Sequence, residues 1–413
     1  MNSFRINAPT QQVSCDPRNP DFYQNPYPLY AELNENCPVF FWEEYGHWCF
    51  TGWDDVNALL RDKRFGRQIL HVATRKELGW PDPESHLSNF EAIDEHSLLE
   101  LEPPEHTRLR TLVNRAFVSR QVEQLRPRIE TLANGLVDSF QDEGKVELIE
   151  AFCAPIPVMI ISEMLGVPLH MAPQLLDWSH RMVMMYAYGR NEAIEHDANT
   201  AARDFASYIK QLAEEKRKQP GEDLISYMIT TEHRGQILTD EELISTSVLL
   251  LNAGHEATVH QAGNAIKTIL ETTPDPKALF TTPENTENVV LECLRYDAPL
   301  HMFSRFALSD IELDGGLKLK KGDKIGLILG GANRDPKRFA DANTFNPSRT
   351  DQANVSFGAG IHFCIGAPLA RIELQAALKI LFDRLPGLKL EVPPRYRNDY
   401  HFHGLEKLEA SWS

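Results

Sequence analysis

The sequence contains no long hydrophobic run. Its longest apolar stretches, VMII at residue 158 and VLLLNAG at residue 248, fall far short of the roughly 20 residues that a helix needs to cross a bilayer. The opening segment, MNSFRINAPTQQ, has no apolar stretch typical of a signal peptide. We therefore expect a soluble, cytoplasmic protein that does not associate with a membrane.

An excess of basic residues is also absent. The chain has 42 Lys and Arg residues against 59 Asp and Glu residues, which gives a net charge of -17, and no basic run stands out against this balance. Proteins bind the nucleic-acid backbone mainly through Lys and Arg. We therefore expect no nucleic-acid partner.

Closely paired cysteines are absent as well. The six cysteines are scattered along the chain, and none has the CxxC spacing of a zinc site. We expect five of them to be reduced thiols that fill space in the core or on the surface: Cys15, Cys37, Cys49, Cys153 and Cys293. Cys364 is different, because a glycine-rich segment surrounds it.

The chain also lacks internal repeats, low-complexity segments and a Gly/Ser-rich hinge, so we expect residues 1–413 to form one domain. Apolar residues recur three and four positions apart from about residue 104 to 272, which indicates helices, and the helix-rich core should span about 104–300. Short alternating stretches near 38–51, 305–329 and 388–412 indicate strands on either side of this core. The predicted fold is mainly α with small β-sheets.

One long helix has recognisable ends. Thr239 followed by Glu242 has the spacing of a capping box, and Pro274 lies just beyond the last apolar positions. About thirty residues at ~1.5 Å each would make a rod of roughly 50 Å. Its middle contains Gly254, which costs about 1 kcal/mol relative to alanine, and Glu256 within an apolar stretch. Neither residue benefits a purely structural helix, so we expect a functional role here.

The segment SFGAGIHFCIGAPLARIEL, residues 356–374, places Cys364 beside the start of another helix. Backbone N–H groups and the helix dipole favour a thiolate at such a position. Three interpretations remain open on these grounds: a packing cysteine, a nucleophile, or a metal thiolate. No local Cys/His/Asn signature supports the nucleophile.

The stretch FGAGIHFCIG resembles the haem-binding loop of the cytochrome P450 monooxygenases, whose pattern is FGxGxHxCxG. The resemblance implies haem b as cofactor, with Cys364 as its axial thiolate and Phe357, Gly358 and Gly366 beside it. It also implies the P450 fold, with the long helix lying over the haem. A thiolate ligand pushes electron density onto iron and favours O–O cleavage.

Further segments extend this resemblance along almost the whole chain. ECLR at residue 292 resembles the family's ExxR motif, and the i, i+3 spacing lets Glu292 and Arg295 pair on one helix face. ANRDPKRFADANTFNPSR resembles the family's meander, and Arg349 at its end would complete a structural network with this pair.

The family also supplies donors for the haem propionates. EPPEHTRLR resembles the segment that carries two of them, and His106 and Arg110 stand four residues apart, hence on one helix face. Arg305 matches the third donor and His362 the fourth. Four donors suit the two propionates of a haem.

The resemblance implies a monooxygenase that inserts one oxygen atom of O2 into a small organic substrate, by hydroxylation or O-dealkylation. Glu256 stands where the family has its acid, which delivers protons for oxygen cleavage. Most members follow this acid with threonine, but this chain has Ala257 there and the hydroxyl one residue later, on Thr258. We therefore expect an oxygen-bearing substrate that takes the place of the missing alcohol. The alternatives are a peroxide-using haem enzyme and a haem-thiolate binding or sensor protein.

Four side chains are expected to line the substrate pocket: Leu250, Ala253, Leu300 and Phe303. By resemblance, electrons come from a ferredoxin and its ferredoxin reductase. Arg108, Arg115 and Arg371 lie in segments expected to border the docking face, where a basic patch could steer an acidic donor.

Overall fold

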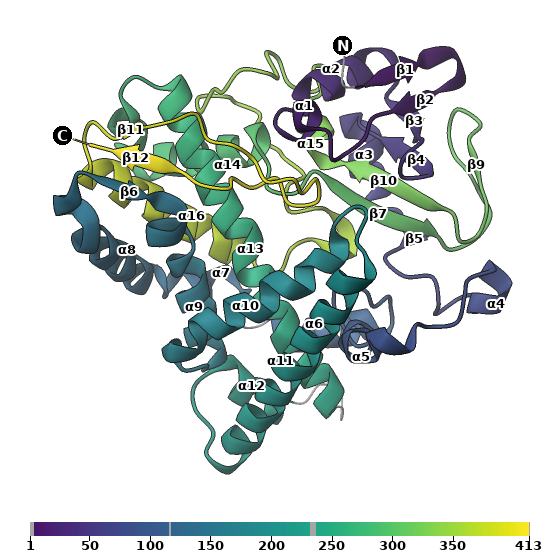
Figure 1. Cartoon of the computed structure of the whole chain (residues 1–413), viewed down its shortest axis with the longest axis horizontal. Coiled ribbons are helices and arrows are strands. Elements are labelled where there is room, and N and C mark those ends of the chain that lie inside the picture. The colour runs from purple at the N-terminus through teal and green to yellow at the C-terminus, as the bar shows by residue number, and fades with distance from the viewer. Residues whose placement is uncertain (1–3, 115–116, 232–236, 413) are drawn as a thin grey trace. The chain divides into compact units, whose positions relative to one another are not determined.

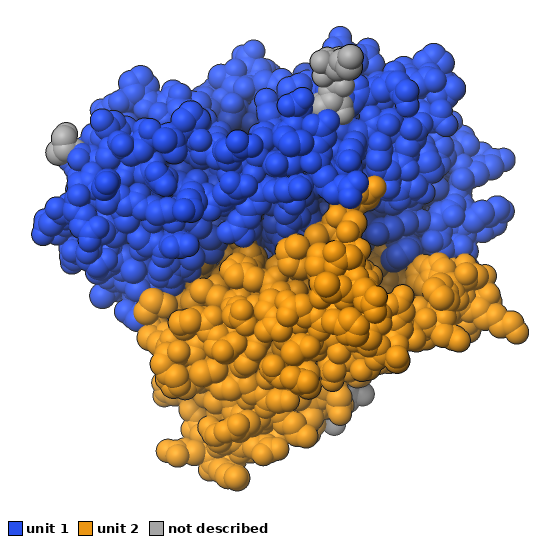
Figure 2. All heavy atoms as spheres, viewed as in Figure 1, with its two compact units in different colours: residues 1–65, 125–156, 257–413 blue, residues 66–124, 157–256 orange. Residues whose placement is uncertain are grey.

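The computed structural model describes residues 4–114, 117–231 and 237–412. Helices dominate and small sheets accompany them (Figure 1), which confirms the mainly α fold predicted from the sequence. The chain forms two compact units (Figure 2). Unit 1 comprises residues 1–65, 125–156 and 257–413, and unit 2 comprises residues 66–124 and 157–256.

The largest described sheet lies in unit 1, with the end of its last strand at the unit boundary. Its strands are β1 (Arg5–Asn7), β2 (Gln12–Ser14), β3 (Val39–Trp42), β4 (His47–Phe50), β10 (Lys324–Ile328), β7 (Met302–Ala307) and β5 (Phe65–Gly66), in this spatial order. The pairs β2–β3 and β4–β10 are parallel, whereas β1–β2, β3–β4 and β10–β7 are antiparallel. Side chains of β3 alternate between buried and half-buried, as the period of two predicts.

Two smaller sheets also belong to unit 1. One is antiparallel and consists of β11 (Lys389–Leu390), β12 (Glu409–Ser411) and β6 (Lys145–Glu147), and the other pairs β8 (Ile311–Glu312) with β9 (Lys318–Leu319). The alternating stretches near 38–51, 305–329 and 388–412 all contain strands, as predicted. The sequence did not predict β1, β2, β5 and β6, which have only two or three residues each.

The α-helices of unit 1 are α1 (Pro20–Tyr23), α2 (Tyr27–Asn36), α3 (Trp53–Leu59), α8 (Arg126–Phe140), α14 (Pro283–Tyr296), α15 (Leu329–Ala332) and α16 (Ala367–Arg384). α14 begins at a cap, because the Thr282 side chain accepts a hydrogen bond from the Asn285 N–H. α16 packs on α8, where Arg384 donates to Asn134 Oδ1 over 2.9 Å. The cap at Thr282 stabilises the start of α14, which precedes the loop around Cys364, and the contact with α8 stabilises α16, which follows that loop.

The α-helices assigned mainly to unit 2 are α4 (Arg75–Leu78), α5 (Ser88–Asp94), α6 (Glu105–Asn114), α7 (Ser119–Glu123), α9 (Pro155–Leu165), α10 (Ala172–Val183), α11 (Glu192–Lys218) and α12 (Leu224–Thr230). α11 starts at Asn191, whose side chain accepts from the Ile194 N–H, and buries residues three and four apart, such as Ala198 and Ala202. Short helical turns within the described residues are η1 (Ala8–Thr10), η2 (Ser85–Leu87), η4 (Gln141–Glu143), η5 (Ile149–Cys153), η6 (Leu169–Met171), η7 (Met184–Tyr186), η8 (Pro276–Phe280) and η9 (Gly360–His362).

The long helix α13 (Asp240–Thr272) has 33 residues and the ends that the sequence predicts. Glu242 N–H donates to Thr239 Oγ1 over 3.2 Å, and Thr239 N–H donates to the Glu242 carboxylate over 3.0 Å, so the capping box is present. The glycine at position 254 has a structural explanation, whereas the sequence led us to expect a functional role. A Cβ at this position would lie 2.9 Å from Cγ1 of Ile161 on α9, so any larger residue would force the Ile161 side chain to shift.

Across residues 4–114, 117–231 and 237–412, no helix combines the length and the apolar character that crossing a membrane requires.

Candidate active site

The cysteine loop of unit 1 runs from Phe357 to Gly366 and leads into α16. Cys364 N–H donates to the Phe357 carbonyl over 3.0 Å and closes the loop, while Gly358 N–H donates to the Val355 carbonyl over 2.8 Å. Cys364 is exposed, and so are the apolar side chains Ile361 and Phe363. The loop thus presents a sulfur atom beside apolar side chains that the protein itself does not cover.

Two glycines of the loop are required by backbone conformation and by space. Gly358 and Gly360 have φ angles of +69° and +72°, which side chains rarely allow. A Cβ on Gly358 would lie 3.1 Å from the Phe303 ring, and one on Gly360 would lie 2.5 Å from the Leu60 carbonyl oxygen. Gly366 differs, because a Cβ there would meet only Cys364 Sγ, at 3.9 Å. Within the chain, space therefore remains beside the sulfur at Gly366.

These features fit a haem group. A flat, largely apolar macrocycle with an iron atom needs an accessible thiolate, apolar neighbours and a backbone that lets it approach closely. Cys364, Ile361, Phe363 and Gly366 offer these features in one loop.

The other five cysteines are all buried. Burial raises the pKa of the Cys15 thiol to about 12, and burial likewise raises the pKa of Cys153 and Cys293. A thiol with a raised pKa stays protonated and is a poor metal ligand. This agrees with their interpretation as space-filling thiols.

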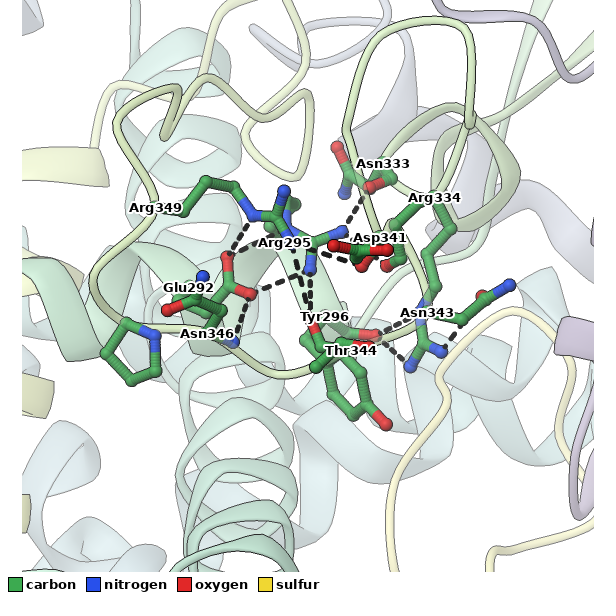
Figure 3. A network of polar contacts seen from close by, with 12 residues as sticks. Glu292, Arg295, Tyr296, Asn333, Arg334, Asp341, Asn343, Thr344, Asn346 and Arg349 are labelled. Atoms are coloured by element: carbon green, nitrogen blue, oxygen red, sulfur yellow. Dashed lines mark hydrogen bonds and ion pairs between the residues drawn. The ribbon is translucent and has the colours of Figure 1, made fainter.

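Glu292, Arg295 and Arg349 meet in the interior of unit 1 (Figure 3). The Arg295 guanidinium donates through Nε and Nη2 to the two Glu292 oxygens, over 2.8 and 2.7 Å. Arg349 Nε lies 3.5 Å from Glu292 Oε2. Arg295 and Glu292 side chains are fully buried, so this bidentate pair is shielded from water.

Carbonyl groups of the meander complete the environment of Arg295. Its Nη1 donates to the carbonyls of Asn333 and Ala342, over 2.9 Å each, and its Nη2 donates to the Thr344 carbonyl over 3.2 Å. Asn346 N–H donates to Glu292 over 2.8 Å. The ExxR pair therefore holds the chain at residues 333–346 in place (Figure 3).

Asn333 connects this network to the cysteine loop, which the sequence analysis missed. Its side chain donates to Ser356 Oγ and accepts from Val355 N–H, both over 2.8 Å. Ser356 Oγ in turn donates to the Leu294 carbonyl over 2.6 Å. The sequence does contain a signal for this contact, because Asn333 is a polar residue at the end of the apolar run LILGGAN.

Arg305 and His362, two of the expected propionate donors, lie in unit 1. Arg305 is buried on β7, opposite Ile325 of β10, and its Nη1 donates to the Ser304 carbonyl over 2.9 Å. His362 is half-buried in η9, two residues before Cys364.

The other two donors, His106 and Arg110, lie on α6 of unit 2. His106 is buried and Arg110 is half-buried, one helical turn further along. Arg108 on the same helix is paired with Glu242, which does not support its expected role in an exposed basic patch. Arg115 lies outside the described residues.

Glu256 is buried in α13, and two histidines of unit 2 face it. Its Oε1 lies 2.5 Å from Nδ1 of His180 on α10 and 3.5 Å from Nε2 of His255. His180 is half exposed, whereas His255 is buried. The sequence did not predict these partners, because the approach of α10 is a tertiary contact with no local pattern.

Ala257, Thr258 and Gln261 follow on the same helix. Ala257 is half-buried, Thr258 is buried, and Gln261 is almost fully buried. Within the described residues, neither polar atom of the Gln261 side chain has a hydrogen-bond partner. A buried amide without protein partners is a good place for an ordered water.

The four expected pocket residues are found in different settings. On α13, Leu250 is buried but Ala253 is exposed, although it stands in the middle of a 33-residue helix. In unit 1, Leu300 forms a β-bridge with Phe402, and Phe303 packs near Gly358. Ala253 is thus accessible on α13 of unit 2, and Phe303 lies beside the cysteine loop of unit 1.

One buried group of possible metal ligands is better explained by hydrogen bonding. Ligand atoms of Asp297, His301 and His403 lie within 4.8 Å of one another. The two Asp297 oxygens, however, accept hydrogen bonds from the hydroxyls of Tyr27 and Tyr396, over 2.6 and 2.5 Å. We interpret this group as a structural cluster.

Comparison with known proteins supports the interpretation of the loop and the ExxR pair. A family model described as Cytochrome P450 matches residues 284–395. The polyketide biosynthesis cytochrome P450 PksS of Bacillus subtilis (strain 168) is 34% identical over 413 residues, covering 98% of this chain and 100% of PksS. The cytochrome P450 monooxygenase PikC of Streptomyces venezuelae is 36% identical over 403 residues, covering 95% of this chain and 92% of PikC.

A solved structure shows the same fold. The crystal structure of P450BioI in complex with hexadec-9Z-enoic acid ligated acyl carrier protein has a TM-score of 0.88 and 31% identity, covering 95% of this chain and 100% of that chain. Identity above 30% over nearly complete chains, together with the matching loop and ExxR network, leads to one conclusion. This chain is an enzyme of the cytochrome P450 monooxygenase family.

Proposed function

We propose that this enzyme inserts one oxygen atom of O2 into a small, oxygen-bearing organic substrate, by hydroxylation or O-dealkylation. The observation that carries the proposal is the exposed Cys364 in a loop of apolar, closely approachable residues. The net reaction consumes the substrate, O2, two electrons and two protons, and yields the oxidised product and water.

Haem b would be held by the Cys364 thiolate, beside Phe357, Gly358 and Gly366, with His106, Arg110, Arg305 and His362 as propionate donors. When bound, it supplies oxygen activation, which a thiolate ligand promotes. The ExxR network of Glu292, Arg295 and Arg349 keeps the loop in shape through Asn333 and Ser356. Its role is therefore structural.

Glu256 is the group that holds the proton for oxygen cleavage. Its burial next to His180 favours this role over the two alternatives, because a peroxide-using enzyme or a sensor has no need of a buried acid supplied with protons. Ala257 leaves no hydroxyl at the position after the acid. Thr258, Gln261 or the substrate itself must then organise the water that receives the proton.

The substrate class follows from Ala257 and from the relatives. PksS is named for polyketide biosynthesis. A polyketide-like molecule carries hydroxyl and carbonyl groups, so it can supply the polar group that Ala257 lacks. We propose such a substrate, with Leu250, Ala253, Leu300 and Phe303 as apolar contacts.

Electrons would come from a ferredoxin and its ferredoxin reductase. Of the three arginines expected to steer the donor, Arg371 on α16 is the best candidate, since Arg108 is paired with Glu242. Arg371 also lies over the Phe357 ring, 5.3 Å from its centroid, and so touches the cysteine loop.

The test combines the absorption spectrum of the haem with isotope labelling of the product. The reduced, carbon monoxide-treated protein should show the long-wavelength band from which the family takes its name, and Cys364→Ser should lose it. Cys293→Ser, a buried cysteine on α14, is the matched control and should keep the band. With ferredoxin, reductase and a hydroxylated macrolactone as probe, 18O2 should label the product.

Three outcomes count against the proposal. An unchanged band in Cys364→Ser removes the assigned ligand. Product formation from hydrogen peroxide alone, with none from O2 and electrons, identifies a peroxide-using enzyme. Haem binding without turnover across a panel of oxygen-bearing and hydrocarbon substrates identifies a binding or sensor protein.

A further inference from the structure

A second group of possible metal ligands lies in unit 2, where the short helix η2 meets α11. It comprises Glu84 at the start of η2, His86 within η2 and Glu195 in the first turn of α11. Ligand atoms of these three side chains lie within 4.8 Å of one another. The proposed oxygenation gives the three residues no role.

The distances within this group suit a metal coordination shell. His86 Nε2 lies 3.0 Å from Glu195 Oε2 and 3.3 Å from Glu84 Oε2. Ligand atoms that bind zinc tetrahedrally, over about 2.0 to 2.1 Å, lie about 3.3 Å from one another. The imidazole nitrogen and the two carboxylates can therefore share one ion after a small movement of the side chains.

Hydrogen bonding explains this group less well than it explains the group around Asp297, whose oxygens accept from two tyrosine hydroxyls. His86 Nε2 carries at most one hydrogen, yet two carboxylates approach it. A hydrogen bond joins it to Glu195 over 3.0 Å, whereas the contact with Glu84 is an ion pair. An ion between the three side chains would satisfy all of them at once.

The packing of η2 and α11 holds the ligands in place before an ion binds. Asn199 Oδ1 on α11 accepts hydrogen bonds from the N–H groups of Asn89 and Phe90, over 2.8 and 2.9 Å, at the start of the helix that follows η2. Glu195 is itself oriented, because its Oε1 accepts from Arg190 Nε over 2.9 Å and its Oε2 is then directed at His86. Such preorganisation lowers the entropy cost of binding.

The donor set selects the kind of ion. Mg²⁺ and Ca²⁺ prefer oxygen ligands, whereas Zn²⁺ readily combines imidazole nitrogen with carboxylate oxygen and can take water as its fourth ligand. The two carboxylates also offset the charge of a divalent ion. We propose that Glu84, His86 and Glu195 bind one Zn²⁺ ion, which ties η2 to α11 across 109 positions of the sequence.

The experiment titrates the tag-free, haem-loaded enzyme with zinc chloride and follows binding by calorimetry. His86→Gln and Glu84→Gln each remove one ligand. Glu84 is 57% exposed, so Glu84→Gln tests the site even if His86→Gln does not fold. His170→Gln on η6 and Glu192→Gln on α11 are the matched controls, since both side chains are exposed in the same unit and lie outside the group.

We expect one zinc ion per chain, with micromolar affinity, in the wild type and in both controls. Residues that merely orient a metal ligand change affinity about 10- to 100-fold, so loss of a ligand in Glu84→Gln or His86→Gln should weaken binding at least about tenfold. Magnesium chloride should not compete with zinc. Equal zinc affinity in the wild type and all four variants would overturn the proposal. Absence of zinc binding by the wild type would do so too, and would leave His86 as a protonated partner of the carboxylates.

Two further measurements locate the ion without any turnover, so they are independent of the proposed oxygenation. X-ray absorption at the zinc edge should show nitrogen and oxygen ligands at about 2.0 to 2.1 Å, whereas sulfur at about 2.3 Å would place the ion on a cysteine and refute the site. Zinc should also slow hydrogen exchange of the segment 84–90 in the wild type but not in Glu84→Gln, because the ion would hold this segment on α11. Unchanged exchange in the wild type would identify an adventitious ion only.

Discussion

Removing one partner of the buried ExxR pair should destabilise this enzyme more than any change in a surface ion pair. Glu292→Ala leaves the Arg295 guanidinium fully buried with three carbonyl acceptors but without its carboxylate. Loss of one member of a buried ion pair costs about 3 to 5 kcal/mol. We expect the upper part of this range for Arg295→Ala, because it deprives Glu292 and three carbonyls of their donors at once.

Arg295→Lys distinguishes charge from geometry. Arg295 makes five hydrogen bonds through three nitrogens, whereas a lysine has one nitrogen with three donors. If charge alone mattered, Arg295→Lys would be nearly neutral. We expect it to lose at least half of the stability lost in Arg295→Ala, about 2 kcal/mol.

The assay is urea unfolding of the purified protein, followed by haem absorption and by far-ultraviolet circular dichroism. Lys379→Ala is the control, because Lys379 pairs with Asp383 on the exposed side of α16 and such pairs contribute about 0 to 1 kcal/mol. Haem absorption should be lost at lower urea than helicity in the network variants, since Arg295 holds the meander. A cost below 1 kcal/mol for Glu292→Ala, with normal haem content, would refute this reasoning.

Two further predictions concern buried polar groups. Burial raises the pKa of Glu373 well above its usual value, so the folded state binds a proton that the unfolded state releases, and stability should fall as pH rises above the unfolded pKa of about 4.3. Glu373→Gln should therefore gain on the wild type by up to about 1.4 kcal/mol per pH unit in urea unfolding; parallel curves from pH 5 to 8 would contradict this. Thr258→Ala should change the product formed per electron pair less than twofold, whereas a substrate analogue without its hydroxyl or carbonyl should lose about tenfold or more to peroxide. Efficient coupling of the analogue together with uncoupling by Thr258→Ala would assign the relay to the side chain.

Features set by local backbone chemistry were predictable from the sequence. The ends of α13 follow from Thr239, Glu242 and Pro274, which satisfy or terminate backbone hydrogen bonding within one turn. The cysteine loop was recognisable from its resemblance to the family's haem-binding pattern, and two glycines of that pattern, Gly358 and Gly360, adopt φ angles that other residues avoid. In both cases the residues that form the sequence pattern are the same residues whose backbone conformation or hydrogen bonding determines the local structure.

Features set by distant parts of the chain were not predictable. The role of Gly254 was misjudged, because the Ile161 side chain that excludes a Cβ lies on another helix. His180 was missed for the same reason, since nothing on α10 indicates a carboxylate 76 positions away. Strands of two or three residues, such as β5, are too short to show an alternating pattern.

Three buried glutamates of this chain show how the partner determines the role. Glu292 accepts two hydrogen bonds from the Arg295 guanidinium in the interior of unit 1 and serves as a fixed structural joint. The oxygens of Glu373 have no hydrogen-bond partner among the described residues, so burial raises the pKa of this carboxyl well above its usual value and favours its protonated form. Glu256 lies 2.5 Å from Nδ1 of the half-exposed His180, so an imidazole rather than a guanidinium is its neighbour. Burial alone therefore does not determine the role of a glutamate; the groups packed against its carboxyl must be considered as well.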